Sequence, residues 1–198
     1  MSLIRVHGRD HVPTDGPVIL ASNHLSFIDS VVIRFAAPRR VTFLAKAEYF
    51  TGRGPRGLFM RWFFTAAGSV PVARGQHRAA QAALDTALDV LAAGNVFGIY
   101  PEGTRSLDGR LYRGRTGVAW LALTSGVPVV PVALHGTDRL QPVGKWLPRP
   151  HRVTVQFGPA LRFTGDPASA RARRNVTNEV MHAIGALSKQ ERADRYAA

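Results

Sequence analysis

A histidine and an aspartate stand five positions apart near the amino terminus, in the run Asn23-His24-Leu25-Ser26-Phe27-Ile28-Asp29. On one continuous helix this spacing turns through about 500°, which leaves the two side chains about 140° apart. If His24 instead lies in a loop and a helix begins near Ser26, a favoured N-cap type, Asp29 faces back toward the imidazole. Such a pair predicts a general base that activates a hydroxyl. The spacing by itself more often means a surface histidine and a helix-end aspartate, because short motifs recur by accident.

A second polar segment, from Tyr100 to Ser106, follows an apolar run and is dense in groups that bind anions. Gly103 allows close backbone approach, Thr104 offers a hydroxyl, and Arg105 can hold a phosphate through two parallel hydrogen bonds. Glu102 would repel a phosphate, so we expect it to orient an arginine or a substrate hydroxyl. The segment therefore predicts an anion site.

Two further cations, Lys46 and Arg74, each follow another apolar run. Taken singly, such a residue is usually solvated at a protein surface. If the fold gathers the ends of these runs, both cations add positive charge to the anion site. Their contribution therefore depends on how the strands are arranged.

Short apolar runs alternate with helical patterns along the chain. The runs that predict strands cover residues 18–21, 41–45, 70–72, 96–100, 127–134 and 153–157. Helical patterns cover residues 76–93, 116–124 and 168–187. This alternation predicts an α/β fold, as one three-layer domain over residues 1–198 with a mixed, largely parallel sheet flanked by helices.

The predicted sheet explains how distant polar segments could meet. Residues 22–24, 73–75 and 101–105 each directly follow a predicted strand. In open α/β sheets, ligands bind beyond the carboxyl ends of the strands. We therefore expect the three segments to line one pocket.

The composition restricts the possible chemistry. The chain has 198 residues, no cysteine and a formal net charge of +13, carried mostly by arginine. The lack of cysteine excludes disulfides, thiolate metal sites and a cysteine nucleophile. The charge indicates nucleic acid, an anionic membrane surface or a phosphorylated substrate as the partner, unless it only reflects a GC-rich genome. No apolar run reaches about 18 residues and no secretory signal opens the chain, so a soluble or peripheral protein is expected.

Together these segments resemble the glycerolipid acyltransferase family, which includes the 1-acyl-sn-glycerol-3-phosphate acyltransferases. Four family blocks occur in the expected order, at residues 23–29, 68–74, 100–106 and 127–132. The third block, a Pro-Glu-Gly-Thr-Arg run after a strand, is the most specific. The resemblance implies a glycerol-3-phosphate acyltransferase-like fold and an O-acyltransferase activity in phospholipid biosynthesis.

The resemblance also implies a role for each matching residue. His24 is the catalytic base and Asp29 is its partner, while Pro131 shapes the acyl side of the site. The acceptor's glycerol phosphate is bound by Lys46, Arg74, Glu102, Gly103, Thr104 and Arg105. The departures from the family pattern are Pro71-Val72, Ala73 and Tyr100, and they affect the acceptor more than the chemistry.

The implied reaction uses no metal and no cofactor besides its acyl donor. His24 takes the proton from the free hydroxyl of 1-acyl-glycerol-3-phosphate (lysophosphatidic acid). The oxygen then attacks the thioester of acyl-CoA or acyl carrier protein, which gives phosphatidic acid. Backbone N–H groups near the first or third block are expected to stabilise the oxyanion. A serine hydrolase is disfavoured because no Gly-x-Ser-x-Gly elbow is present.

The substrates carry long chains, so we expect peripheral binding to an anionic membrane surface on its cytoplasmic face. Residues 58–64 combine aromatic side chains with a cation, which is typical of an interfacial segment but also of a buried helix. Relatives often carry N-terminal apolar helices. This chain begins almost at its first predicted strand, so such helices are absent or trimmed.

Other functions remain as alternatives. Within the enzyme class, the acceptor could be another lysolipid, such as lysophosphatidylglycerol or an amino-acid lysolipid. A nucleic-acid-binding module would need cations along one face with aromatic stacking platforms, whereas Arg171, Arg173 and Arg174 lie in one predicted helix without them. A lipid-binding protein with a dead site is disfavoured because His24, Asp29 and Glu102 are all present.

Overall fold

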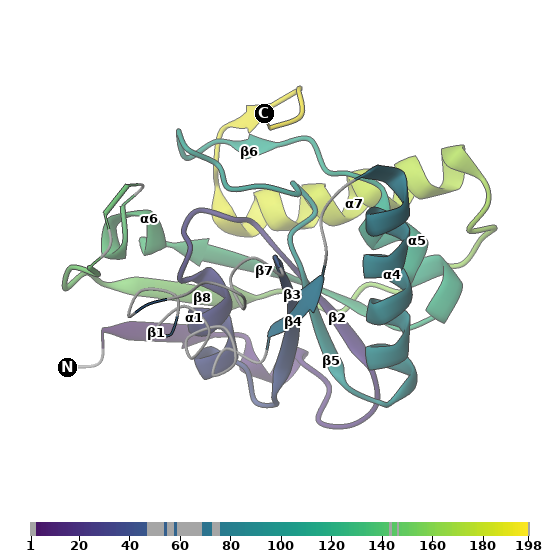
Figure 1. The fold of residues 1–198 in the computed structure, drawn as a ribbon, viewed down its shortest axis with the longest axis horizontal. Helices are drawn as coiled ribbons and strands as arrows, with labels where there is room; N and C mark the ends of the chain where they lie inside the picture. The colour runs from purple at the N-terminus through teal and green to yellow at the C-terminus, as the bar shows by residue number, and fades with distance from the viewer. Residues whose placement is uncertain are drawn as a thin grey trace.

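A seven-stranded sheet forms the centre of the computed structural model, which describes residues 3–46, 54, 58, 69–72, 76–142, 144–145 and 147–197. Its strands, in spatial order, are β1 (Ile4–His7), β8 (Val153–Phe157), β7 (Val129–His135), β2 (Val18–Ser22), β5 (Val96–Ile99), β3 (Val41–Lys46) and β4 (Ser69–Val72). Only the pairing of β7 with β8 is antiparallel. The sheet is therefore mixed and largely parallel, as the sequence predicts (Figure 1).

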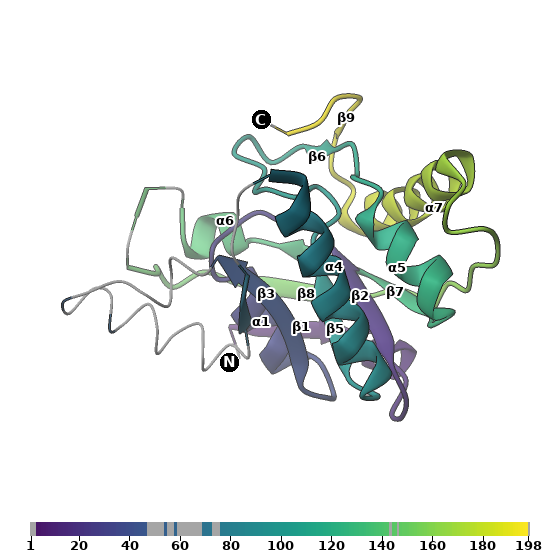
Figure 2. The same cartoon turned by 45° about the vertical axis from the view of Figure 1, so that its right-hand side comes forward.

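Helices cover both faces of the sheet, which gives three layers (Figures 1 and 2). One face carries α1 (Asp29–Ala36) and a 3₁₀ turn at Arg9–His11. The other carries α4 (Gln76–Ala92), α5 (Gly117–Ser125) and α7 (Ala170–Ser188), while α6 (Thr137–Leu140) follows β7. The three predicted longer helices are confirmed to within two residues at each end.

Alternation along β2 supplies both cores. Successive side chains of a strand point to opposite faces. Val18 and Leu20 accordingly pack with Ile33 of α1, whereas Ile19 and Ala21 pack with the helices of the other face. Burying each large aliphatic side chain stabilises the fold by roughly 1.5–3 kcal/mol relative to exposing it. The strand is fully buried on both sides because each face has its own helical layer.

The register of the sheet positions the polar segments. β2 pairs in parallel with β5, Ala21 opposite Ile99, so the residues after both strands emerge at one edge. β7 lies on the other side of β2, with Ser22 opposite Val132. The expected meeting of residues 22–24 and 101–105 therefore follows from this pairing, whereas residues 73–75 lie outside the described residues.

Several short elements were not predicted from the sequence. β1 at the sheet edge keeps three of its four side chains exposed, so it lacks the apolar alternation that marks a half-buried strand. A second, two-stranded sheet pairs β6 (Leu111–Tyr112) with β9 (Arg192–Ala193). Both strands are two residues long and pair across the chain, so no local pattern marks them. This small sheet ties the C-terminal segment to the loop after Glu102 (Figure 2).

Among the helices that the structure describes, none is both long enough and apolar enough to cross a membrane. The aromatic segment at residues 58–64 lies outside the described residues except for Leu58, which is exposed.

Candidate active site

His24 and Asp29 meet at the carboxyl end of β2. The Nδ1 atom of His24 lies 2.9 Å from Oδ2 of Asp29. A carboxylate only accepts hydrogen bonds, so Nδ1 carries the proton and donates it, and the lone pair of the neutral ring is on Nε2. The His24 side chain keeps 18% of its surface exposed, while that of Asp29 has none. The pair thus presents a base at the surface of the site, held from below by a buried carboxylate.

The loop between the two residues is closed by the same carboxylate oxygen. Oδ2 of Asp29 also accepts the backbone N–H groups of Leu25, at 2.7 Å, and of Ser26, at 2.8 Å. The helix α1 begins at Asp29 itself, three residues later than the start expected near Ser26, because these N–H groups are bound by the Asp29 side chain. Oδ1 of Asp29 is buried without a hydrogen-bond partner among the described residues. A positive charge on the imidazole would therefore be stabilised by this carboxylate.

Tyr100 supports the imidazole from its flat side. The two rings are stacked with centroids 3.9 Å apart and planes 10° from parallel. The Tyr100 hydroxyl lies 2.8 Å from Oγ of Ser30, and Phe43 stacks behind the ring at 5.5 Å. Burial, together with the nearby charge of Asp29, raises the pKa of Tyr100 well above its ordinary value. The phenol therefore stays neutral, and its stacked ring restricts the orientation of the imidazole plane.

Glu102 joins the two sequence blocks through their backbones. Its Oε1 accepts the His24 N–H at 3.1 Å, and its Oε2 accepts the Tyr112 N–H at 2.9 Å. The side chain is completely buried. Burial raises the pKa of Glu102 from 4.5 to about 7, against the lowering effect of its two backbone hydrogen bonds. Glu102 therefore positions the histidine loop and contacts no arginine side chain among the described residues, while its contact with a substrate hydroxyl stays a prediction.

Of the remaining residues predicted to bind phosphate, the structure describes three in full. Gly103 is exposed with φ at +79°, and the half-buried Thr104 and Arg105 follow it in the same segment. Neither side chain of this pair makes a hydrogen bond or ion pair within the described part of the chain. The backbone of Lys46 ends β3, but its side chain is not described, and Arg74 lies outside the described residues.

Pro131, expected on the acyl side, is buried in β7 opposite Ala21. Its ring lies against Gly158, where an added Cβ would come within 2.9 Å of the proline Cγ. This contact is with the protein core, and the acyl-side role of Pro131 stays a prediction.

Sequence reasoning missed two residues that hold the histidine loop. The Asn23 side chain is fully buried and bonds both backbone groups of Leu134 on β7, at 2.8 and 3.0 Å. Its Nδ2 also donates to Oε1 of Gln190 at 2.8 Å, and Gln190 in turn donates to the Gly109 carbonyl. The position of Asn23 directly before His24 was a sequence signal that could have indicated its contact with Leu134. Nothing local marked Gln190, because its partners lie far away along the chain.

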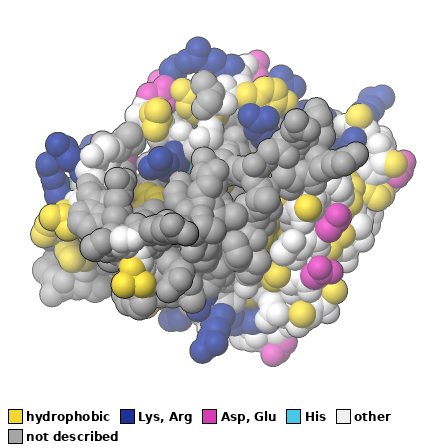
Figure 3. Space-filling model, viewed as in Figure 1, with side chains coloured by type: hydrophobic (Ala, Val, Ile, Leu, Met, Phe, Trp, Pro, Cys, Tyr) yellow, Lys and Arg dark blue, Asp and Glu magenta, His cyan; other side chains and the backbone are white. Residues whose placement is uncertain are grey.

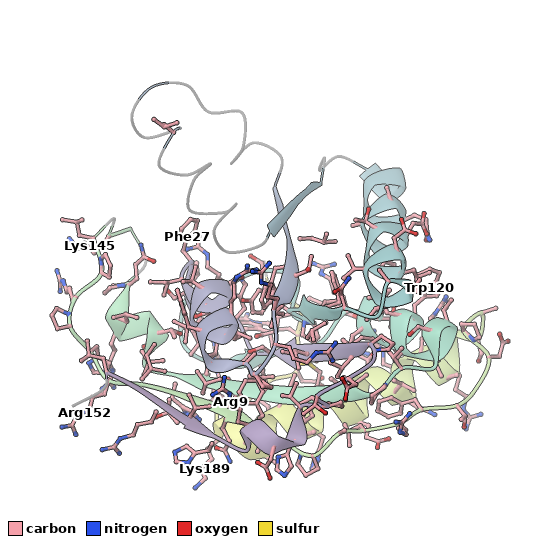
Figure 4. All side chains as sticks on the ribbon, turned by 90° about the horizontal axis from the view of Figure 1, so that it is seen from below. Arg9, Phe27, Trp120, Lys145, Arg152 and Lys189 are labelled. Atoms are coloured by element: carbon pink, nitrogen blue, oxygen red, sulfur yellow. The ribbon has the colours of Figure 1, made fainter. Side chains whose placement is uncertain are left out.

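A cavity of about 400 Å³ opens beyond the carboxyl end of β7. It is lined by Leu25, Gly109, Leu134, His135, Gly136, Asp138, Arg139, His151, Arg152, Thr154 and Gln190. Figure 4 shows Arg152, next to β8, on the same side of the molecule as Lys145. None of the residues predicted for the site lines this cavity, although Leu25 follows His24 directly. Within the described residues, no group of three histidine or carboxylate side chains is placed to hold a metal ion.

Comparison with known proteins finds relatives described as acyltransferases. A 1-acyl-sn-glycerol-3-phosphate acyltransferase of Chlamydomonas reinhardtii is 34% identical over 160 residues, which cover 80% of this chain and 46% of that protein. The corresponding enzyme of Limnanthes douglasii is 32% identical over 165 residues, or 80% of this chain and 54% of that protein. The chain thus spans about half the length of these relatives.

A solved structure shows the same fold. The crystal structure of the 1-acyl-sn-glycerophosphate (LPA) acyltransferase PlsC from Thermotoga maritima matches with a TM-score of 0.71 and 29% identity, covering 93% of this chain and 71% of that one. The sequence profile of the Acyltransferase family matches residues 3–135, which include both the His24 loop and the Glu102 segment. The chain therefore belongs to the acyltransferase family.

Proposed function

We propose that the protein transfers a fatty acyl group from a thioester to the free hydroxyl of 1-acyl-glycerol-3-phosphate and so forms phosphatidic acid. The observation that carries the proposal is the 2.9 Å contact of His24 with the buried carboxylate of Asp29, which leaves Nε2 as the base. The relatives named above, described as acyltransferases for this acceptor, support the choice of acceptor.

In the proposed reaction, His24 carries the proton from the acceptor to the leaving thiolate. Nε2 of His24 takes the acceptor's hydroxyl proton, and the oxygen forms a bond to the thioester carbonyl carbon. The tetrahedral intermediate then collapses, its C–S bond breaks, and the imidazolium returns the proton to the thiolate. Backbone N–H groups of Thr104 and Arg105, which donate no hydrogen bond among the described residues, are the candidate donors to the oxyanion.

The acceptor's phosphate is assigned to Arg105, with Gly103 and Thr104 beside it. Arg105 is half-buried and has no acidic partner in the described part of the chain, so its guanidinium is available to a phosphate. Lys46 and Arg74 are assigned to the same phosphate on the resemblance alone. Acyl-CoA and acyl carrier protein both remain as donors.

The proposed location is the cytoplasmic face of a membrane, bound peripherally. The net charge of +13 favours an anionic lipid surface. Exposed apolar side chains are also present near the site, including Leu107, which is 71% exposed. This placement would give the site access to both long-chain substrates.

The test is the release of free thiol from palmitoyl-CoA in the presence of a panel of lysophospholipids. We expect the highest kcat/KM with 1-acyl-glycerol-3-phosphate, and lower values with lysophosphatidylglycerol and with an amino-acid lysolipid. His24→Ala should lower kcat by about 10²–10⁴-fold, because proton transfer by a positioned base contributes that much. His182→Ala, which changes an exposed histidine on α7, is the matched control. Acyl transfer by His24→Ala at the wild-type rate would exclude the mechanism, and a preference for another lysolipid would exclude the acceptor.

A further inference from the structure

Arg115 lies directly over the glycine of the predicted phosphate segment. A Cβ added at Gly103 would come within 2.9 Å of both Cδ and Nε of Arg115. The Arg115 N–H also donates to the Pro101 carbonyl at 2.8 Å, which fixes its backbone to the same segment. Gly103 is therefore needed for its positive φ and also for the space that the arginine side chain occupies.

Three guanidinium groups gather on the ring of Tyr196. Arg113, Arg115 and Arg174 lie 5.3, 5.5 and 6.0 Å from its centroid. Arg174 is anchored, because it donates to the Gly114 carbonyl and to the Tyr196 hydroxyl, both at 2.8 Å. The helix α7 holds no aromatic residue, as predicted, but Arg174 has an aromatic neighbour from elsewhere in the chain, because Tyr196 follows β9.

Arg113 and Arg115, hereafter the arginine pair, differ from Arg174. Both are exposed, and neither guanidinium makes a hydrogen bond or an ion pair within the described residues. The carboxylates that do form ion pairs there belong to Asp29, bound to His24, and to Asp108, bound to Arg110. Like charges held on one ring repel each other unless an anion lies between them. Dark blue side chains gather at the top of Figure 3, where β6 and the C-terminal end lie in Figure 1.

We propose that the arginine pair, held on Tyr196, binds a phosphate group of one of the two substrates beside Gly103. Guanidinium groups bind phosphate through parallel charge-assisted hydrogen bonds, and cation–π contact with Tyr196 pre-orients them. The inference rests on the proposed function, because that reaction supplies the phosphates. They have two sources: the acceptor's head group, and the phosphates of the acyl donor.

The experiment measures kcat and KM for each substrate separately in Arg115→Ala and in Arg113→Ala/Arg115→Ala. We expect the KM of one substrate to rise by about 10- to 100-fold in the double variant, as for the loss of a charge-assisted hydrogen bond, with kcat changed less than about threefold. A rise in the KM for 1-acyl-glycerol-3-phosphate assigns the pair to the acceptor, and a rise for palmitoyl-CoA assigns it to the donor. Arg115→Lys should restore part of the binding, because it keeps the charge but loses the planar fork.

The matched control is Arg162→Ala. Arg162 is exposed and follows Leu161, which bridges to Val129 at the amino end of β7, the edge opposite the site. Unchanged KM values for both substrates in the double variant would overturn the proposal. The proposal would also be overturned if the double variant lost affinity for a single-stranded oligonucleotide without any change in KM, because the arginine pair would then bind nucleic acid.

Calorimetric titration with pyrophosphate and with CoA separates this inference from the proposed function. Binding by the wild-type protein that is lost in the double variant supports the site even if no acyl transfer is detected. Equal binding by both proteins overturns the site even if acyl transfer proceeds normally. Circular dichroism melting of each variant confirms that the exposed substitutions leave the fold intact.

Discussion

The histidine loop (residues 23–29) and Arg115 of the arginine pair both contact the segment at residues 101–103, but the charged groups of the two regions are held in opposite ways. Around the histidine loop, Asp29 and Glu102 are completely buried, and together they accept five hydrogen bonds from His24, Leu25, Ser26 and Tyr112. In the arginine pair, both side chains are exposed and lie against the ring of Tyr196, and the Arg115 side chain also lies over Gly103. Both buried carboxylates are thus bound by groups of the protein, whereas the arginine pair has no acidic partner among the described residues.

This difference fits the role that is proposed for each region. A general base must be held in one geometry before the substrate arrives, because reorganisation during the reaction would raise the barrier. A charged substrate group instead provides its own partner on binding, and free guanidinium groups avoid the cost of separating an existing ion pair. Substitutions of His24, Asp29 or Glu102 should therefore change kcat or stability, whereas those in the arginine pair should change KM.

The largest effect is expected for Asp29→Asn. The asparagine oxygen can still accept the N–H groups of Leu25 and Ser26, but the negative charge beside His24 is lost. The imidazolium then loses its stabilising partner, and kcat should fall by about 10³-fold or more. Single-turnover acyl transfer measures the effect, with thermal unfolding as the check on folding. A kcat within tenfold of the wild-type value would show that catalysis needs the hydrogen bonds of residue 29 but not its negative charge.

A smaller effect, on stability, is expected from Glu102. Its pKa is raised from 4.5 to about 7, so between these values the folded protein holds a proton that the unfolded chain has released. The free energy of unfolding should therefore fall as pH rises through this window, by roughly 3 kcal/mol at most. Urea unfolding between pH 4.5 and 7 measures the slope.

Glu102→Gln removes the titrating group and should remove this part of the slope. The matched control is Glu179→Gln, at an exposed glutamate on α7, which should keep it. The same pH dependence in the Glu102 variant and in the wild-type protein would contradict the assignment of the buried proton to Glu102.

The smallest effect should come from Tyr100→Phe. The ring that stacks on His24 stays, and only the hydrogen bond to Ser30 is lost. We expect the free energy of unfolding to fall by about 1 kcal/mol and kcat to change less than about threefold. Tyr100→Leu, which also removes the stacked ring, should lower kcat further. If the phenylalanine variant loses more than about tenfold in kcat, the hydroxyl and not the ring supports the imidazole.

Local sequence determined the strands, the longer helices and the segments that form the site. Apolar runs of strand length and helical spacing are short-range signals, so β2, β5 and α4 could be predicted within a few residues. The pairing of His24 with Asp29 could be predicted from their spacing. The start of α1 could not, because the Asp29 side chain binds the N–H groups just before the helix. The phosphate-binding roles of Lys46, Arg74 and Arg105 stay predictions.

Only the tertiary structure decided which groups complete the site. The contact of Glu102 with His24 spans 78 residues, and that of Asn23 with Leu134 spans 111. A short sequence window carries no signal for such contacts, since they arise when parallel strands bring their carboxyl ends to one edge. The same is true of Tyr196, which reaches the arginine pair through the small sheet of β6 and β9. The sequence therefore specified the chemical groups, and the sheet order specified their neighbours.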